Sequence, residues 1–373
     1  MRRSENLIYA AAFIALILAP FYLGGYELSL LGRFLAMGIL AMGISLVWGN
    51  AGILPLGQGL FFGLGGYALA MHLKLTALGP GEIPDFMQWN GLNSLPWLWV
   101  PFKSGIFALF AAVAFPAIVA AALAWLVFHR RVGGVYFAII TQALVLAATT
   151  FIVSQQGYTG GFNGLTDFGS AFGFDLSDPH TQLGLYWLTL VILGLIFIAG
   201  QWLLQTHFGK LLRAIRDGEN RVRFLGYDSA PYKVIVFALG AVLAGIAGVL
   251  YTLNISVISP AMIGVMPSIE MVVWVAVGGR ESLAGAVLGT LLVNFAKDKV
   301  SSAFPEAWLY LMGALFVFVV TLMPQGIGGL LDSLFNRGKG EARETVVIPP
   351  VLVVSGDLPK EIVSSHQKEE AHS

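Results

Sequence analysis

The chain has 373 residues, of which 57% are hydrophobic and only 11% charged, whereas an ordinary soluble domain carries about 25% charged residues. So few charges cannot cover a water-facing surface, and the composition indicates a helical bundle in lipid. The 21 Lys and Arg balance the 21 Asp and Glu, so no charge bias suggests nucleic acid as a partner. The absence of cysteine excludes disulfides, Cys-ligated zinc, iron–sulfur clusters and thiol nucleophiles.

Apolar runs that could cross a bilayer recur along the whole chain. A spanning helix needs about 20 mostly apolar residues. Eight runs approach or reach that length: 7–25, 33–49, 52–73, 105–128, 133–153, 183–204, 234–256 and 307–331. The first follows Arg2 and Arg3 and could be a secretory signal. It lacks a clear small-x-small cleavage site, however, so we expect a retained first helix with a cytoplasmic N-terminus.

Two shorter apolar runs, 269–278 and 283–296, lie before the last span and are separated by Gly279-Arg280-Glu281-Ser282. At 1.5 Å per residue neither easily crosses a core of roughly 30 Å. We therefore predict two short or broken helices near 268–297, lining a cavity as in transporters. The alternative is one long helix with a buried polar kink. The predicted fold class is all-α, a polytopic transmembrane bundle of about 8 to 10 spans.

The distribution of Lys and Arg predicts the orientation. The 205–233 segment carries six basic and three acidic residues, a net charge of +3, and Arg2, Arg3 and Arg130 should share its side. By the positive-inside rule this side is cytoplasmic. The segments 75–104 and 154–182 contain a single basic residue, Lys103, and should therefore face outward. We predict a membrane domain over 1–331 and a mostly disordered cytoplasmic tail over 332–373.

The chain contains none of the common catalytic or nucleotide-binding motifs. It has no G-x-x-x-x-G-K-[ST] loop, no H-E-x-x-H and no G-x-S-x-G elbow, and its six histidines do not cluster. We therefore expect a protein that is not an enzyme and holds no cofactor or metal. Any use of ATP must come from a partner.

Polar residues inside the predicted spans are costly in lipid, and they are the candidates for a solute pathway. The candidates are Gln58, Thr141, Gln142, Glu270 and Asn294. The uncharged ones suit a neutral polar solute, but they could equally be interhelical hydrogen bonds worth about 0.6 kcal/mol each. Glu270 could instead pair with a helix N-terminus or reach to water.

Glycines in two spans have the spacing of tight helix crossings. They are Gly57, Gly59, Gly63, Gly65 and Gly66 in one span, and Gly240, Gly245 and Gly248 in another. This pattern predicts close helix packing and says nothing of the substrate.

The basic segment from Thr206 to Tyr227 carries the most specific pattern. It predicts a short amphipathic helix with Leu212, Ile215, Val222 and Phe224 on its apolar face, ending before Gly226. Such a helix can bind in a groove of another protein. The alternative is a solvated charged loop near anionic headgroups.

Three blocks carry a resemblance to a known family: SLVWGNAGILPLGQGLFFGLGGY from Ser45, FGKLLRAIRDGENRVRFLG from Phe208 and SIEMVVWVAVGGRESLAGAVLG from Ser268. They resemble permeases of the branched-chain amino acid and urea importers driven by ATP-binding cassettes. Leu56-Gly57-Gln58-Gly59 and the tryptophan-rich insert 86–102 are most similar to the urea permeases of the LivM-like type. The likeness covers about residues 33–330.

The resemblance implies a heteromeric importer in the plasma membrane, the inner membrane of a bacterium. Its partners would be a second permease subunit, two cytoplasmic ATPases and an external solute-binding protein. The coupling helix would include Arg213, Ala214, Ile215, Arg216, Asp217, Glu219, Asn220 and Gly226. Urea is the expected solute, since a neutral solute needs no buried ion pair. A branched-chain amino acid importer and a passive channel for small polar solutes are the alternatives.

Overall fold

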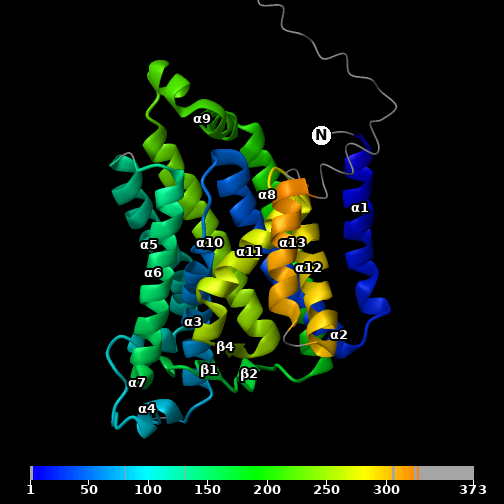
Figure 1. Ribbon diagram of the computed structural model, residues 1–373. Helices are drawn as coiled ribbons and strands as arrows, with labels where there is room; N and C mark the ends of the chain where they lie inside the picture. The colour runs from blue at the N-terminus through cyan, green and yellow to red at the C-terminus, as the bar shows by residue number, and fades with distance from the viewer. Residues whose placement is uncertain (1–2, 80, 131, 305–306, 323–325, 327–373) are drawn as a thin grey trace, which may run out of the picture. The chain divides into compact units, whose positions relative to one another are not determined.

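The computed structural model describes residues 3–79, 81–130, 132–304, 307–322 and 326, and the described part is almost entirely helical (Figure 1). The helices are α1 Arg3–Leu18, η1 Ala19–Phe21, α2 Gly25–Ile44, η2 Ser45–Asn50, α3 Gln58–Thr76, α4 Asp85–Trp89, η3 Val100–Lys103, α5 Gly105–His129, α6 Gly134–Ser154, α7 Gln156–Thr159, α8 Pro179–Gln205, α9 His207–Phe224, α10 Ser229–Ile255, η4 Pro260–Met262, α11 Val265–Gly278, α12 Leu283–Ala303 and α13 Ala307–Leu322. The predicted tail, 332–373, lies outside the described residues.

The all-α membrane bundle predicted from the sequence is confirmed. Each of the eight predicted spans contains a helix. Among the described residues, six helical segments are long and apolar enough to cross a bilayer: 25–50, 105–129, 134–154, 179–205, 229–255 and 260–278. The described strands are two-residue pairs in loops, β1 Leu165–Thr166 with β4 Val257–Ile258 and β2 Ser170–Ala171 with β3 Phe174–Asp175, both antiparallel.

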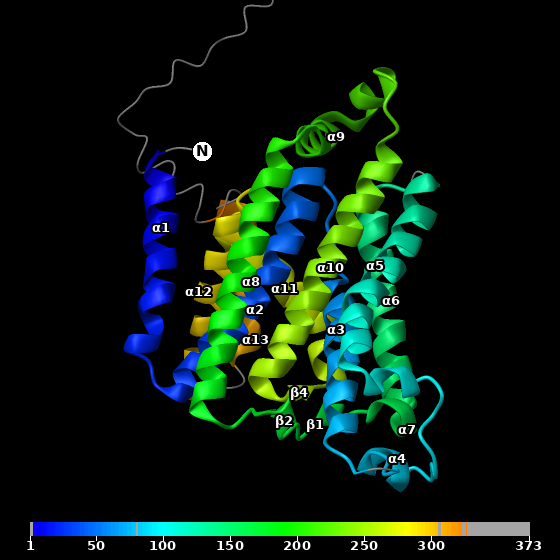
Figure 2. The same ribbon diagram turned by 180° about the vertical axis from the view of Figure 1, so that it is seen from behind.

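Helix α10 packs against α2, α3 and α5 at the centre of the bundle (Figure 2). Two of its predicted small-residue positions allow this. A Cβ on Gly248 would lie 2.0 Å from the carbonyl oxygen of Phe62, and one on Gly65 of α3 would lie 2.2 Å from that of Gly245. Only glycine lets the backbones approach so closely, so the glycine pattern is confirmed as a packing device.

The span expected at 52–73 begins later than predicted. After the π-helical turn η2, the chain runs without helix from Gly52 to Gly57, and α3 starts at Gln58. Gly52 has φ +71°, a left-handed conformation that glycine adopts without strain, and Pro55 interrupts a regular helix. Irregular backbone in a membrane protein must be buried in protein or line a cavity.

The segments 265–278 and 283–303 form a helical hairpin. A Cβ on Gly278 of α11 would lie 1.9 Å from the carbonyl oxygen of Gly285 in α12, and one on Gly289 would lie 2.3 Å from that of Trp274. Gly279, with φ +109°, makes the turn, and the Ser282 hydroxyl accepts a hydrogen bond from the Gly285 amide at 3.1 Å. The prediction of two helices is confirmed, and the alternative of one kinked helix is wrong. Only α11, with 14 residues, is short, because α12 has 21 residues.

The helix α8 runs from the 154–182 segment at one end of the bundle to α9 at the other end (Figure 1). The α11–α12 hairpin extends between the same two ends of the bundle. Its open end follows β4, which pairs with β1 of the 154–182 segment. Its turn contacts α9 through Arg216 and Glu281. The 154–182 segment therefore lies at the open end of the hairpin, and α9 lies at its turn.

Candidate functional site

The predicted amphipathic helix exists as α9, and it ends at Phe224, before Gly226. Gly218 interrupts it with non-helical dihedral angles, so two helical pieces meet at a kink. Leu211, Ile215 and Val222 form a small buried cluster against Tyr232 of α10. The interpretation of this segment as a solvated loop is therefore wrong.

Two arginines fix α9 to neighbouring elements. The Arg213 guanidinium donates to the Leu204 carbonyl near the end of α8 at 2.5 Å. Arg216 donates to the Gly49 carbonyl in η2 at 2.5 Å and pairs with Glu281 in the hairpin turn at 3.1 Å. These bonds connect α9 to three separate parts of the bundle.

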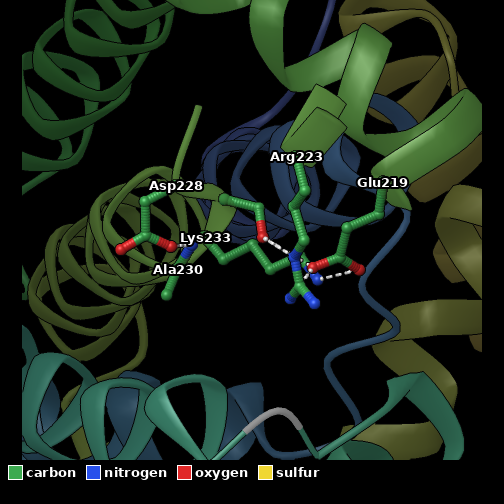
Figure 3. Close-up of polar contacts among 6 residues, drawn as sticks. Glu219, Arg223, Asp228, Ala230 and Lys233 are labelled. Atoms are coloured by element: carbon green, nitrogen blue, oxygen red, sulfur yellow. Dashed lines mark hydrogen bonds and ion pairs between the residues drawn. The ribbon is translucent and has the colours of Figure 1, made fainter. Parts of the chain in front are cut away.

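Glu219 joins α9 to the start of α10 through a cluster of charged groups (Figure 3). Its carboxylate accepts hydrogen bonds from Arg223 at 2.7 Å, from Lys233 at 2.6 Å and from the Ser229 hydroxyl at 2.6 Å. Burial raises the pKa of Glu219, but the hydrogen bonds from Lys233 and Ser229 and the charges of Lys233 and Arg223 outweigh it. The net result is a pKa below the ordinary value.

The residues predicted to form the coupling helix therefore divide into two groups. Arg213, Arg216 and Glu219 bond to this chain's own bundle, and Ile215 is buried in it. The exposed group is Ala214, Asp217, Asn220 and Gly226. Most of the apolar face is thus already occupied, and the expectation that it is available to another protein is wrong for Leu212, Ile215 and Val222. Phe224, 92% exposed, and Leu225, 77% exposed, remain accessible.

Gln58, Thr141 and Gln142 lie in the interior, around the start of α3 and the middle of α6. Gln58 is buried, and both its amide oxygen and its nitrogen lack a hydrogen-bond partner among the described residues. The same holds for the amide of Gln142. Thr141 donates to the Ala138 carbonyl within its own helix at 2.8 Å, and a Cβ on Gly57 would lie 2.9 Å from its backbone oxygen. The structure thus brings Thr141 against the residue before Gln58.

Glu270 and Asn294 line a cavity of about 470 Å³ near the open end of the α11–α12 hairpin. The Glu270 carboxylate pairs with Lys297 of α12 at 2.5 Å, while the Asn294 side chain donates to the Thr290 carbonyl in its own helix at 2.9 Å. Gln58, Thr141 and Gln142 do not line this cavity. The five predicted pathway residues therefore lie at two places.

Sequence reasoning missed Arg33, Trp274, Lys297 and Asp298, which also line the cavity. A signal was present, because Arg33 and Lys297 stand next to apolar runs. Charges at such positions are common at the ends of spans, whereas the structure places these two at a shared cavity. The described residues include no group of three or more His, Asp or Glu that could hold a metal ion.

Long apolar helices, a segment of irregular buried backbone, a charged cavity and an amphipathic basic helix at one end define a multi-pass transport protein. The chain belongs to the family described as the permease component of the branched-chain amino acid transport system, whose model matches residues 27–320. It is a permease subunit of the ATP-binding-cassette type in the plasma membrane.

Several characterised permeases are similar to this chain. The high-affinity branched-chain amino acid transport system permease protein LivM of Escherichia coli K12 is 25% identical, over 87% of this chain and 75% of the relative. BraD of Pseudomonas aeruginosa, of the same description, is 24% identical over 78% of this chain and 91% of the relative. LivH of Salmonella typhimurium is 31% identical over 45% of this chain and 54% of the relative. No solved structure matches.

Proposed function

We propose that this chain is the membrane-spanning permease subunit of an ATP-driven importer of branched-chain amino acids. It would act with a second permease subunit, two cytoplasmic ATPases and an external solute-binding protein. The names of the relatives support the amino acid over urea, since LivM and BraD are both described as branched-chain amino acid permeases. The passive-channel alternative receives no support from them.

The observation that carries the transport mechanism is the set of bonds between α9 and the bundle. Movement of α9 would act on α8 through Arg213, on η2 and the hairpin turn through Arg216, and on α10 through Glu219. A helix fixed at four places transmits a rigid-body displacement instead of absorbing it. On this proposal, closure of the ATPases moves α9 and switches the pathway between outward and inward access.

The contact with an ATPase would be made by the exposed group on α9 together with Phe224 and Leu225. Two large apolar side chains exposed at the end of a basic helix are suited to a pocket in a partner protein. The double variant Phe224→Ser/Leu225→Ser should leave the permease folded but reduce co-purification of the ATPases at least about tenfold, since burying two such side chains contributes on the order of 3 kcal/mol.

The matched control is Phe174→Ser in β3, which is 67% exposed at the other end of the bundle. It should leave ATPase association unchanged. Undiminished association in the double variant would remove the docking assignment.

Urea remains a second candidate because of one residue. Gln58 stands in the Leu56–Gly59 motif that resembles urea permeases. Its buried amide has a donor and an acceptor with no partner among the residues that the structure describes, and urea could satisfy both. The two candidate substrates can be distinguished by measuring uptake of labelled leucine and of labelled urea. The cells should contain this importer and no other importer of either solute. Leucine uptake that depends on the chain supports the first proposal, and urea uptake alone overturns it.

A further inference from the structure

The cavity at the open end of the α11–α12 hairpin has balanced charges. Its lining contains two cations, Arg33 of α2 and Lys297 of α12, and two anions, Glu270 of α11 and Asp298 of α12. Ionisable groups in membrane-spanning segments are costly, and they mark solute pathways more often than they serve packing alone. A single structural ion pair would need only Glu270 and Lys297, which already contact each other, so the other two charges need another explanation.

Two hydrogen-bond donors of residues that line this cavity lack an acceptor within the described part of the chain. The Nε of Arg33 and the indole Nε1 of Trp274 are buried and have no acceptor among the described residues. A buried donor without a partner costs about 1 to 3 kcal/mol. The guanidinium of Arg33 lies 5.1 Å from the centroid of the Phe34 ring, which stabilises its charge but supplies no acceptor. Both donors are suited to an anionic oxygen from a ligand.

Apolar side chains make up much of the remaining lining, beside the polar Tyr251, Asn294, Ser301 and Ser302. Met37, Phe62, Met262 and Met271 share the cavity with the charged residues. Flexible methionine side chains adapt to branched aliphatic groups. The volume of about 470 Å³ falls in the range of roughly 300 to 1,000 Å³ typical of small-molecule sites.

We propose that this cavity binds a zwitterionic α-amino acid with an aliphatic side chain, a step that rests on the proposed function. Arg33 would donate to the carboxylate, Glu270 and Asp298 would face the ammonium, and the side chain would lie against Phe62 and the methionines. A net-neutral ligand with both charges matches a lining of two cations and two anions. Urea, which is uncharged, could form hydrogen bonds but no ion pair with these groups, and a simple ion would leave half of the charges unmatched.

The test uses the absence of cysteine from this chain. Ser301 also lines the cavity, so Ser301→Cys provides a single thiol there in this subunit. In the assembled importer, leucine should slow alkylation of that thiol by a small polar maleimide. Urea, 4-methylpentanoate, which lacks the ammonium, and 3-methylbutylamine, which lacks the carboxylate, should not. The control Ser170→Cys, in β2, should react at the same rate with and without leucine.

Arg33→Met in the Ser301→Cys background should abolish the protection and raise the leucine concentration for half-maximal uptake about 10- to 100-fold, since a hydrogen bond to a charged group contributes on that scale. Co-purification of the variant with its partner subunits as a monodisperse complex, measured in parallel, shows that the variant is folded and assembled. The cavity assignment would be overturned if the importer transported leucine but leucine did not protect the thiol and Arg33→Met did not change leucine uptake. The proposed function would then remain intact. Absence of leucine transport by the unaltered importer would overturn the proposed function itself, and protection by urea but not leucine would overturn the amino acid class.

Discussion

Two groups of charged residues at opposite ends of the bundle use the same chemistry in different ways. At the α9 end, the Glu219 carboxylate accepts from three side chains, and Lys233 and Arg223 both bond to it. At the cavity, Glu270 pairs with Lys297, but the buried Nε of Arg33 has no acceptor in the described ranges of the chain. The carboxylate of the first group therefore has its hydrogen-bond partners within the protein, whereas the second group retains a donor that the proposed ligand would satisfy.

If both proposals hold, hydrogen-bond saturation distinguishes the structural role of the first group from the binding role of the second. A fully satisfied buried polar cluster makes one conformation rigid, while an unsatisfied donor carries a cost that a ligand can remove. The α11–α12 hairpin connects the two groups, because its turn contains Glu281, which contacts Arg216, and its open end carries Glu270 and Lys297. Variants that disrupt the hairpin, and variants that change only one of the two groups, test this comparison.

The largest effect is expected from Gly278→Val, which breaks the hairpin that joins both groups. The new Cβ would lie 1.9 Å from the Gly285 carbonyl oxygen, and backbone cannot move aside as a side chain can. Overpacking costs about 1 to 3 kcal/mol even in side-chain cores, so we expect loss of folded protein. The measurement is the yield of monodisperse protein in detergent.

The matched control for this variant is Gly184→Val in α8, where a Cβ meets nothing within 4 Å. It should be purified in wild-type yield. Equal yields of the two variants would show that the hairpin contact is not needed for folding.

A smaller effect is expected from Glu219→Gln, which leaves the cavity intact. The variant keeps the shape of the side chain but removes the charge that pairs with Arg223 and Lys233. We expect uptake to fall and ATP hydrolysis to continue, because α9 would no longer be firmly joined to α10. Glu82→Gln, the same carboxylate-to-amide change at an exposed position outside α9, is the control and should transport normally. Parallel loss of uptake and hydrolysis would argue against a coupling role.

The sequence predicted the arrangement of spans well, because hydropathy and helix length decide it. It also predicted the close glycine crossings, the hairpin near 279–282 and the existence of α9. It failed at Gly52–Leu56, where an apolar run was taken as helix. Hydropathy cannot separate an apolar helix from an apolar irregular segment buried by its neighbours, and only Pro55 and the nearby glycines pointed to the break.

The charges were harder to predict than the spans. A pattern along one chain does not show that Arg33, 237 residues away from Glu270, lines the same cavity. In the same way, Arg216 and Glu219 were expected to face an ATPase, but they bond to carbonyl and charged groups of the same chain. Long-range pairing depends on tertiary packing, which the local sequence does not encode.

Charge reversal at one contact of α9 should have an intermediate effect on transport. Arg216→Glu places two carboxylates together at Glu281 and removes the donor to Gly49. The double variant Arg216→Glu/Glu281→Arg restores the opposite charges but not the bond to the Gly49 carbonyl. We expect partial recovery of uptake in the double variant, by about 1 kcal/mol of coupling for a partly exposed pair. No recovery would mean that the bond to Gly49 is the one that matters.

The smallest effect concerns pH. Because the pKa of Glu219 in the folded protein is below its ordinary value of 4.5, the stability that this carboxylate contributes is complete above that value. It is lost as the pH falls through the lower, folded-state pKa. The melting temperature of the wild type should therefore exceed that of Glu219→Gln by a constant margin between about pH 8 and pH 6, and the margin should narrow only below about pH 4.5. A margin that shrinks between pH 8 and pH 6 would show that Glu219 is not held charged by Lys233 and Arg223, and the contrast between the two ends of the bundle would then fail.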